Sequence, residues 1–370
     1  MARLAYGLIL LCSACDDDRL APFAATGDSS DRDRGAPDDD LDPVDSERAP
    51  DPCPPDDPDC DPPEKAEDPA LPGTSAHFVV LPDTQLYARD YPGIFRRQTE
   101  WIADNAAALN ILRVFHLGDI VNDDTVGEWQ QARDAMARLD GVVPYVLVPG
   151  NHDYQHWGWS MNRVTSLNSW FTADEQRAMP GFAGAYQPGR GENTYHLFSA
   201  AGHDWIAVAL EWGPRDEVVA WADAVMHEHD DRLGILVTHA YLNHDDRRYD
   251  HTDTVHDQKH NPHQYDLAGS VNDGEQLWHK LVRHHHFVLT LNGHVTGRGT
   301  GYLASLNDRG NIVHQMLSNY QMRELGGEGY MRLLELLPNG RTLVVRSYSP
   351  LRDRYLTSPD QQMTLQLGVD

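Results

Sequence analysis

The chain has 370 residues and a formal net charge of −27, because 57 acidic residues outnumber 30 basic ones. Such a surface repels phosphate backbones, which argues against a nucleic-acid partner. No apolar run in the sequence approaches the roughly 18 residues of a membrane-spanning helix.

The first 15 residues have the pattern of a secretory signal. Arg3 gives a basic start, an apolar stretch follows over 4–11, and the small pair Ser13-Ala14 stands directly before Cys15. Small residues before a cysteine resemble the cleavage box of bacterial lipoproteins. The pattern therefore predicts export to the bacterial cell envelope, with a lipid anchor on Cys15 as the protein's contact with the membrane.

Residues 16–74 have the composition of a disordered tether. They contain 20 acidic and 5 basic residues, 12 of the 23 prolines and a single aromatic residue, Phe23. Such a segment cannot bury enough apolar surface to offset the entropy lost on ordering. Cys53 and Cys60 are candidates for a small disulfide in an oxidising compartment. Residues 75–370 contain no cysteine, which excludes thiol catalysis and cysteine-zinc sites there.

Residues 75–370 are predicted to form one large α/β domain, because no linker interrupts them. Short apolar runs alternate with helical spacing in the first half, which is typical of βαβ units and a parallel sheet. The second half is richer in strands, so we expect two stacked sheets with helices outside. Strands are predicted at 77–81, 111–117, 142–148, 204–210, 233–237, 287–291, 302–305, 311–317, 331–336 and 342–347, and helices at 94–109, 128–139 and 217–228.

Polar residues follow the ends of the predicted strands. Because the carboxyl ends of strands in open α/β sheets meet at one crevice, these side chains should gather there. Carboxylate oxygens can bridge two ions, and imidazole suits zinc, manganese or iron. The residues that would form such a metal site are Asp83 with Gln85, Asp119 with Asn122, the run Asn151-His152-Asp153, His239 and His294.

Five short motifs resemble, in order and spacing, the blocks of the calcineurin-like metallophosphoesterases. The motifs are Asp83-Thr84-Gln85, Gly118-Asp119, Gly150-Asn151-His152-Asp153, Thr238-His239 and Gly293-His294. The first motif, preceded by Pro82, is closest to an exported bacterial branch. The resemblance implies a four-layer αββα sandwich of two mixed sheets flanked by helices, which agrees with the predicted strands.

The resemblance also implies the roles of individual residues. It gives six metal ligands, which are Asp83, Gln85, Asp119, Asn151, His239 and His294. Asp119 would bridge two divalent ions. His152 would protonate the leaving oxygen while a metal-activated hydroxide attacks phosphorus, and Asp153 is a candidate partner for the His152 ring.

Two departures from the family pattern affect one of the two metal positions. Gln85 stands where the family usually has histidine, and Thr296 replaces the second histidine of the last block. One position keeps its nitrogen donors, whereas the other has oxygen donors that favour Mn, Mg, Ca or Fe over tightly held Zn. We therefore expect one or two divalent ions per chain.

The polar segment 243–270 directly follows the His239 block and holds five histidines. A loop this long in a compact domain is usually functional, so we expect it to lie over the site as a lid. His263 is a candidate for the missing metal ligand. A second ion bound only weakly is the alternative.

The predicted function is hydrolysis of phosphomonoesters or phosphodiesters by a metal-dependent, exported phosphoesterase. The alternative is a non-catalytic surface lipoprotein of the same fold that binds metal or another ligand. His152 favours the enzyme, because a binding module has no need for an acid that protonates a leaving group.

Overall fold

The computed structural model describes residues 74–155, 158 and 160–368. All of its helices and strands belong to the unit Glu67–Asp370. The predicted signal with Cys15, the acidic tether and the Cys53–Cys60 pair lie outside the described residues. Among the residues that are described, no helix is long and apolar enough to cross a membrane.

The first sheet of this unit has seven strands and is mixed. The strands β1, β2 and β3 are parallel and run from the middle of the sheet to one edge, and β11 pairs antiparallel with β1. The order is β13 (Arg354–Leu356), β12 (Thr342–Ser349), β11 (Met331–Leu336), β1 (Ala76–Leu81), β2 (Ile111–His116) and β3 (Tyr145–Leu147), with β14 (Gln362–Gln366) paired to β12.

The second sheet also has seven strands and a parallel centre, formed by β6, β7, β8 and β10. The order is β4 (Phe182–Ala185), β5 (Thr194–Ala200), β6 (His203–Leu210), β7 (Leu233–Thr238), β8 (Phe287–Asn292), β10 (Ile312–Ser318) and β9 (Thr300–Leu306).

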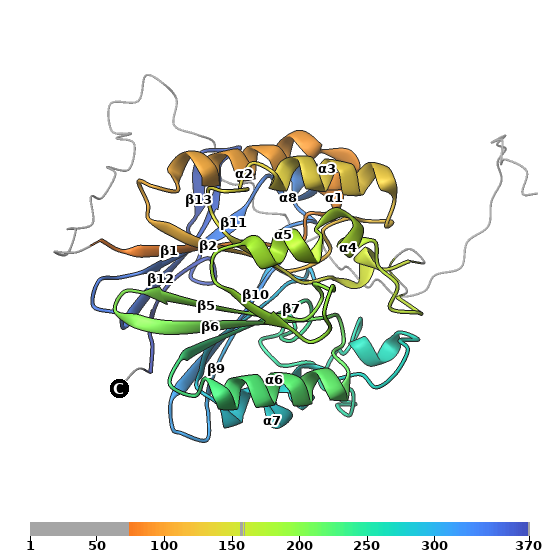
Figure 1. The fold of residues 1–370 in the computed structure, drawn as a ribbon, viewed down its shortest axis with the longest axis vertical. Coiled ribbons are helices and arrows are strands. Elements are labelled where there is room, and N and C mark those ends of the chain that lie inside the picture. The colour runs from red at the N-terminus through yellow and green to blue at the C-terminus, as the bar shows by residue number, and fades with distance from the viewer. Residues whose placement is uncertain (1–73, 156–157, 159, 369–370) are drawn as a thin grey trace, which may run out of the picture. The chain divides into compact units, whose positions relative to one another are not determined.

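Helices cover the outer face of each sheet, so the unit has four layers (Figure 1). On the first sheet lie α1 (Gln85–Asp90), α2 (Pro92–Asn105) and α3 (Val126–Met136), and on the second lie α6 (Asp216–Glu228) and α7 (Gly274–Lys280). Shorter helical pieces are α4 (Leu167–Trp170), α5 (Ala173–Ala178), α8 (Glu324–Gly327), η1 (Asn151–Asp153), η2 (Pro262–Gln264) and η3 (Val282–His284). The predicted αββα arrangement is confirmed.

The alternation of side chains along the central strands explains the layers. In β1, Phe78 and Val80 belong to the core between the sheets, whereas Val79 and Leu81 pack beneath the helices of the first sheet. Successive residues of a strand point to opposite faces. Because both faces are apolar, each sheet can be covered on both sides, as parallel strands require.

Several short elements were not predicted from the sequence, among them β4, β5, β13, β14 and α1. In α1 only six residues are helical, too few to show a helical period. In β5 the run Thr194–Ala200 mixes buried and half-buried residues without strict alternation. Their pairing with neighbours, rather than their own pattern, defines these elements.

Candidate metal centre

The motifs at the strand ends meet where the two sheets face each other. Asp83 and Asp119 follow β1 and β2, and His239 and His294 follow β7 and β8. The loops pack so closely that a side chain on Gly150 would put its Cβ 2.2 Å from Oδ1 of Asp119. The glycine in this motif therefore allows two loops to approach the same point.

Four potential ligand atoms converge at the side chain of His239. Its Nε2 lies 3.2 Å from Oδ1 of Asp119, 3.2 Å from Oδ1 of Asn151 and 3.2 Å from Nδ1 of His294. A single N–H cannot donate well to three acceptors, whereas one cation can be bound by all four atoms. The donor set of two imidazoles, a carboxylate and an amide oxygen fits a divalent transition metal.

The other nitrogen of each ring is held by a backbone carbonyl. Nδ1 of His239 donates to the oxygen of Leu117 at 2.7 Å, and Nε2 of His294 donates to the oxygen of His260 at 2.8 Å. These bonds fix the orientation of the rings, so the remaining nitrogens face the centre. Metal-binding histidines are usually oriented in this way. Burial by itself would lower the pKa of His239, but Asp119 and Asp83 raise it to about 9, so a metal ion at Nε2 would displace a proton.

The charges of the cluster are mutually dependent. Burial would by itself raise the pKa of Asp119, but His239, His152 and His294 together lower it below its usual value. Burial lowers the pKa of His294 to about 3, with His239 adding to the effect, so this ring is neutral. Burial raises the pKa of Asp83 to about 8. A buried carboxyl that ionises with difficulty is stabilised as a carboxylate by a bound cation.

Asp83 contacts the loop that carries His294, together with Asn319. Oδ2 of Asp83 accepts a hydrogen bond from Nδ2 of Asn319 at 2.8 Å, and both carboxylate oxygens lie near the backbone N–H of His294. Oε1 of Gln85 is buried and has no hydrogen-bond partner among the described residues. A buried oxygen without a partner, two residues after a buried carboxyl, has the chemistry expected of an oxygen-rich second metal position.

His152 is positioned by backbone groups. Its N–H donates to Oδ1 of Asp119 at 2.9 Å, and its Nδ1 lies 2.8 Å from the carbonyl oxygen of Asn122. The carboxylate of Asp153 instead accepts the N–H groups of Ile120, Val121 and Gly150. The prediction that Asp153 orients the His152 ring is therefore wrong, because this carboxylate joins the two loops that carry Asp119 and His152.

The segment 243–270 contacts the centre through the backbone of His260, not through the side chain of His263 as we expected. The oxygen of His260 holds His294, as described above. His263 lies outside the cluster, with its Nε2 2.7 Å from Oε1 of Gln276. His263 is therefore not the missing ligand of the second metal position in this structure.

Trp212 is the main contributor that sequence reasoning missed. Its ring lies 5.5 Å from that of His239 and 4.6 Å from that of His294, and Tyr265 packs on its other edge at 5.1 Å. It follows the end of β6, the same kind of position that identified Asp83 and Asp119. In the sequence, an apolar residue after a strand cannot be told from an ordinary core residue. The buried Trp212 ring forms an apolar wall beside the two histidine rings.

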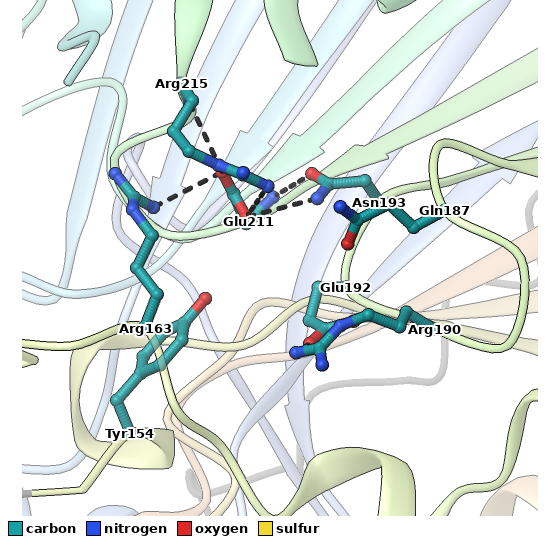
Figure 2. Close-up of a pocket in the computed structure, with 8 residues that line it drawn as sticks. All are labelled: Tyr154, Arg163, Gln187, Arg190, Glu192, Asn193, Glu211 and Arg215. Carbon is teal, nitrogen blue, oxygen red and sulfur yellow. Dashed lines mark hydrogen bonds and ion pairs between the residues drawn. The ribbon is translucent and has the colours of Figure 1, made fainter. Parts of the chain in front are cut away.

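A polar cavity of about 120 Å³ is bounded by ion pairs (Figure 2). Its lining residues are Tyr154, Arg163, Gln187, Arg190, Glu192, Asn193, Glu211 and Arg215. Glu211 accepts a hydrogen bond from Nε of Arg215 at 2.8 Å and pairs with Arg163 at 3.3 Å. Arg163 also donates to the backbone oxygens of Trp212, Gly213, Ala268 and Ser270. Arg163 thus joins the backbone of Trp212 and Gly213, which follow β6, to the end of the 243–270 segment.

Replacing Arg163 by methionine is expected to lower the free energy of unfolding by about 1–3 kcal/mol, because the backbone oxygens of Trp212 and Gly213 lose the guanidinium that satisfies them. Glu211 keeps its ion pair with Arg215. Lysine should rescue little, since it lacks the planar fork that reaches several carbonyls. Urea unfolding measures the effect, and Arg177→Met, at an exposed ion pair, is the control. A loss below 1 kcal/mol would contradict this role.

Comparisons with known proteins agree with this geometry. The family model described as calcineurin-like phosphoesterase matches residues 76–303. The chain is 36% identical over 284 residues to the uncharacterized protein YvnB of Bacillus subtilis (strain 168). The match covers 74% of this chain but only 20% of YvnB, so the chain spans one fifth of that relative's length.

Two solved structures are similar in fold. A purple acid phosphatase from yellow lupin (Lupinus luteus) seeds has a TM-score of 0.50 at 13% identity, covering 80% of this chain and 54% of the lupin chain. A dimetal phosphatase from Danio rerio has a TM-score of 0.48 at 14% identity, covering 80% of this chain and 100% of the other. At 13% identity, the likeness to the lupin protein concerns the fold alone.

Proposed function

This chain belongs to the calcineurin-like phosphoesterase family, and on that premise we propose that its metal centre hydrolyses phosphate monoesters or diesters. The observation that carries the proposal is the convergence of Asp119, Asn151, His239 and His294 next to His152. The first four would bind a divalent ion, and His152 supplies a proton donor at its edge.

The roles of the residues follow from their contacts. Bound divalent ions would activate the attacking water and neutralise the phosphoryl oxygens. Asp119 would be shared between the two metal positions, with Asp83 and Gln85 completing the second. The carbonyl of Asn122 fixes the His152 ring through Nδ1, which leaves Nε2 to protonate the leaving oxygen. Asp153 acts as a positioning residue by holding both loops.

Hydrolysis of nitrophenyl phosphate and of bis-nitrophenyl phosphate by the purified protein tests the proposal directly. We expect turnover of at least one ester in the presence of Mn²⁺ and its loss after treatment with a chelator. Retained metal without turnover of either ester would favour the alternative, a non-catalytic surface protein that binds metal or another ligand.

The two metal positions are expected to differ in affinity, because only one is rich in nitrogen donors. The centre of the wild-type protein should hold one tight ion, and added Mn²⁺ should raise turnover. Thr296→His restores the donor usual in the family and should tighten the second position. Calorimetric titration of metal-free protein measures both affinities. Two equally tight positions in the wild type would contradict this expectation.

We also propose that the protein is exported and lipid-anchored at Cys15, on the support of the signal-like pattern before that cysteine. Cys15→Ser should move the protein from the membrane fraction to the soluble fraction of the cell. An unchanged membrane fraction would exclude the anchor.

Removal of residues 1–74 is expected to leave a folded domain with turnover within about twofold of the full chain. The reason is that the residues of the metal centre and all described strands lie beyond this segment. Turnover and thermal unfolding of the truncated protein measure the effect. A large loss of turnover with folding retained would instead place the acidic segment in the site.

A further inference from the structure

A second group of metal-binding side chains lies outside the centre and consists of His251, His263 and Asp273. Nδ1 of His251 lies 2.9 Å from Oδ2 of Asp273, and Nε2 of His263 lies 3.9 Å from the same oxygen. The two imidazole rings face each other, with centroids 3.8 Å apart and planes inclined by 23°. Nδ1 of His251 thus bonds this carboxylate oxygen directly. Nε2 of His263 lies within 4 Å of it but is bonded to Oε1 of Gln276, a contact that it would exchange for a metal ion.

We propose that these three residues form a separate site for a zinc-class transition metal. Ligand atoms bound at about 2.0–2.2 Å to one zinc ion lie about 3–3.5 Å apart. The distances from the two histidine nitrogens to Oδ2 of Asp273 would therefore need to change by less than about 1 Å. Two imidazoles with one carboxylate suit zinc, nickel, cobalt or copper better than magnesium or calcium. This donor set, with two accessible rings, leaves further coordination positions to water.

The carboxylate is already fixed in the geometry such a site requires. Asp273 is fully buried and caps α7, where its Oδ1 accepts the N–H of Gln276. Its Oδ2 also accepts the backbone N–H of His251 and an amide N–H of Asn261. The ring of His251 adds a third bond to Oδ2, and a metal ion would take the place of that proton. Only the two histidine rings would need to move.

The position of the site suggests what the ion would do. His251 and His263 both belong to the 243–270 segment, whereas Asp273 belongs to the start of α7. Between the two histidines lies His260, whose carbonyl oxygen holds Nε2 of His294 in the centre. A metal ion on His251, His263 and Asp273 would therefore fix the backbone that orients a ligand of the catalytic centre, and so fasten the lid.

Equilibrium dialysis of the full chain against Zn²⁺ tests the site through metal content rather than turnover. The variants are His251→Gln and His263→Gln. The matched control is His256→Gln, in the same segment, whose ring is exposed and bonded to Asp253 instead. Each measurement is repeated in an Asp119→Asn background, so that zinc in the centre is counted separately.

The wild type and His256→Gln should hold one more zinc ion per chain than either variant, in both backgrounds. Loss of a direct ligand should weaken this site by more than the roughly 10–100-fold typical of outer-shell changes. Zinc should also protect residues 243–270 from proteolysis in the wild type and in His256→Gln, but not in His251→Gln or His263→Gln. Equal zinc content in all four proteins would overturn the proposal. Loss of either histidine is enough to test the site, so if one variant fails to fold the other still decides the result. Because zinc content is measured, the result does not depend on phosphoesterase turnover.

Discussion

Asp119→Asn should abolish binding of metal ions at the centre formed with His239 and His294, and lower turnover by at least about a thousandfold. The substitution keeps the shape of the side chain and the Oδ1 that accepts the His152 N–H, but it removes the charge that lies 3.2 Å from His239. Metal ions contribute several kcal/mol of transition-state stabilisation, and about 1.4 kcal/mol corresponds to a tenfold change in rate. Elemental analysis and initial rates measure the two effects.

The matched control is Asp134→Asn, which removes a carboxylate from the exposed face of α3. It should change neither metal content nor turnover. If Asp119→Asn kept its metal and lost less than tenfold in rate, the converging side chains would not be the catalytic metal centre.

His152→Ala should lower turnover by about a hundred- to ten-thousandfold while metal content stays close to that of the wild type. Loss of a general acid has an effect of this size, and His152 contributes no atom to the four that converge at His239. The deficit should be smaller for nitrophenyl esters than for alkyl esters, because nitrophenolate leaves without being protonated. Rates for both kinds of ester, with and without the substitution, give the comparison.

His227→Ala, at an exposed position of α6, is the control for His152→Ala and should have no effect on either ester. Equal deficits for good and poor leaving groups would show that His152 does not act as an acid. Its backbone N–H bond to Asp119 would then leave it a positioning role.

The sequence by itself determined where the central strands lie along the chain and which polar residues follow their ends. The apolar runs of β1, β2, β7 and β8 are local patterns, and burial on both faces follows from them. The candidate ligands were found because each follows a strand directly. Parallel strands bring such positions to one edge whatever the details of the loops.

Only the tertiary structure decided which partner each side chain has. Asp153 stands next to His152 in sequence, yet its carboxylate bonds three backbone N–H groups of the joined loops, and a carbonyl orients the ring instead. Asn319 reaches Asp83 across 236 positions, and Trp212 packs against both metal-site rings. His263 pairs with α7 rather than with the centre. These contacts depend on the paths of long loops between elements. Hydrogen bonds between residues that are distant in the chain produce no periodic pattern in the amino-acid sequence, so the sequence cannot predict them.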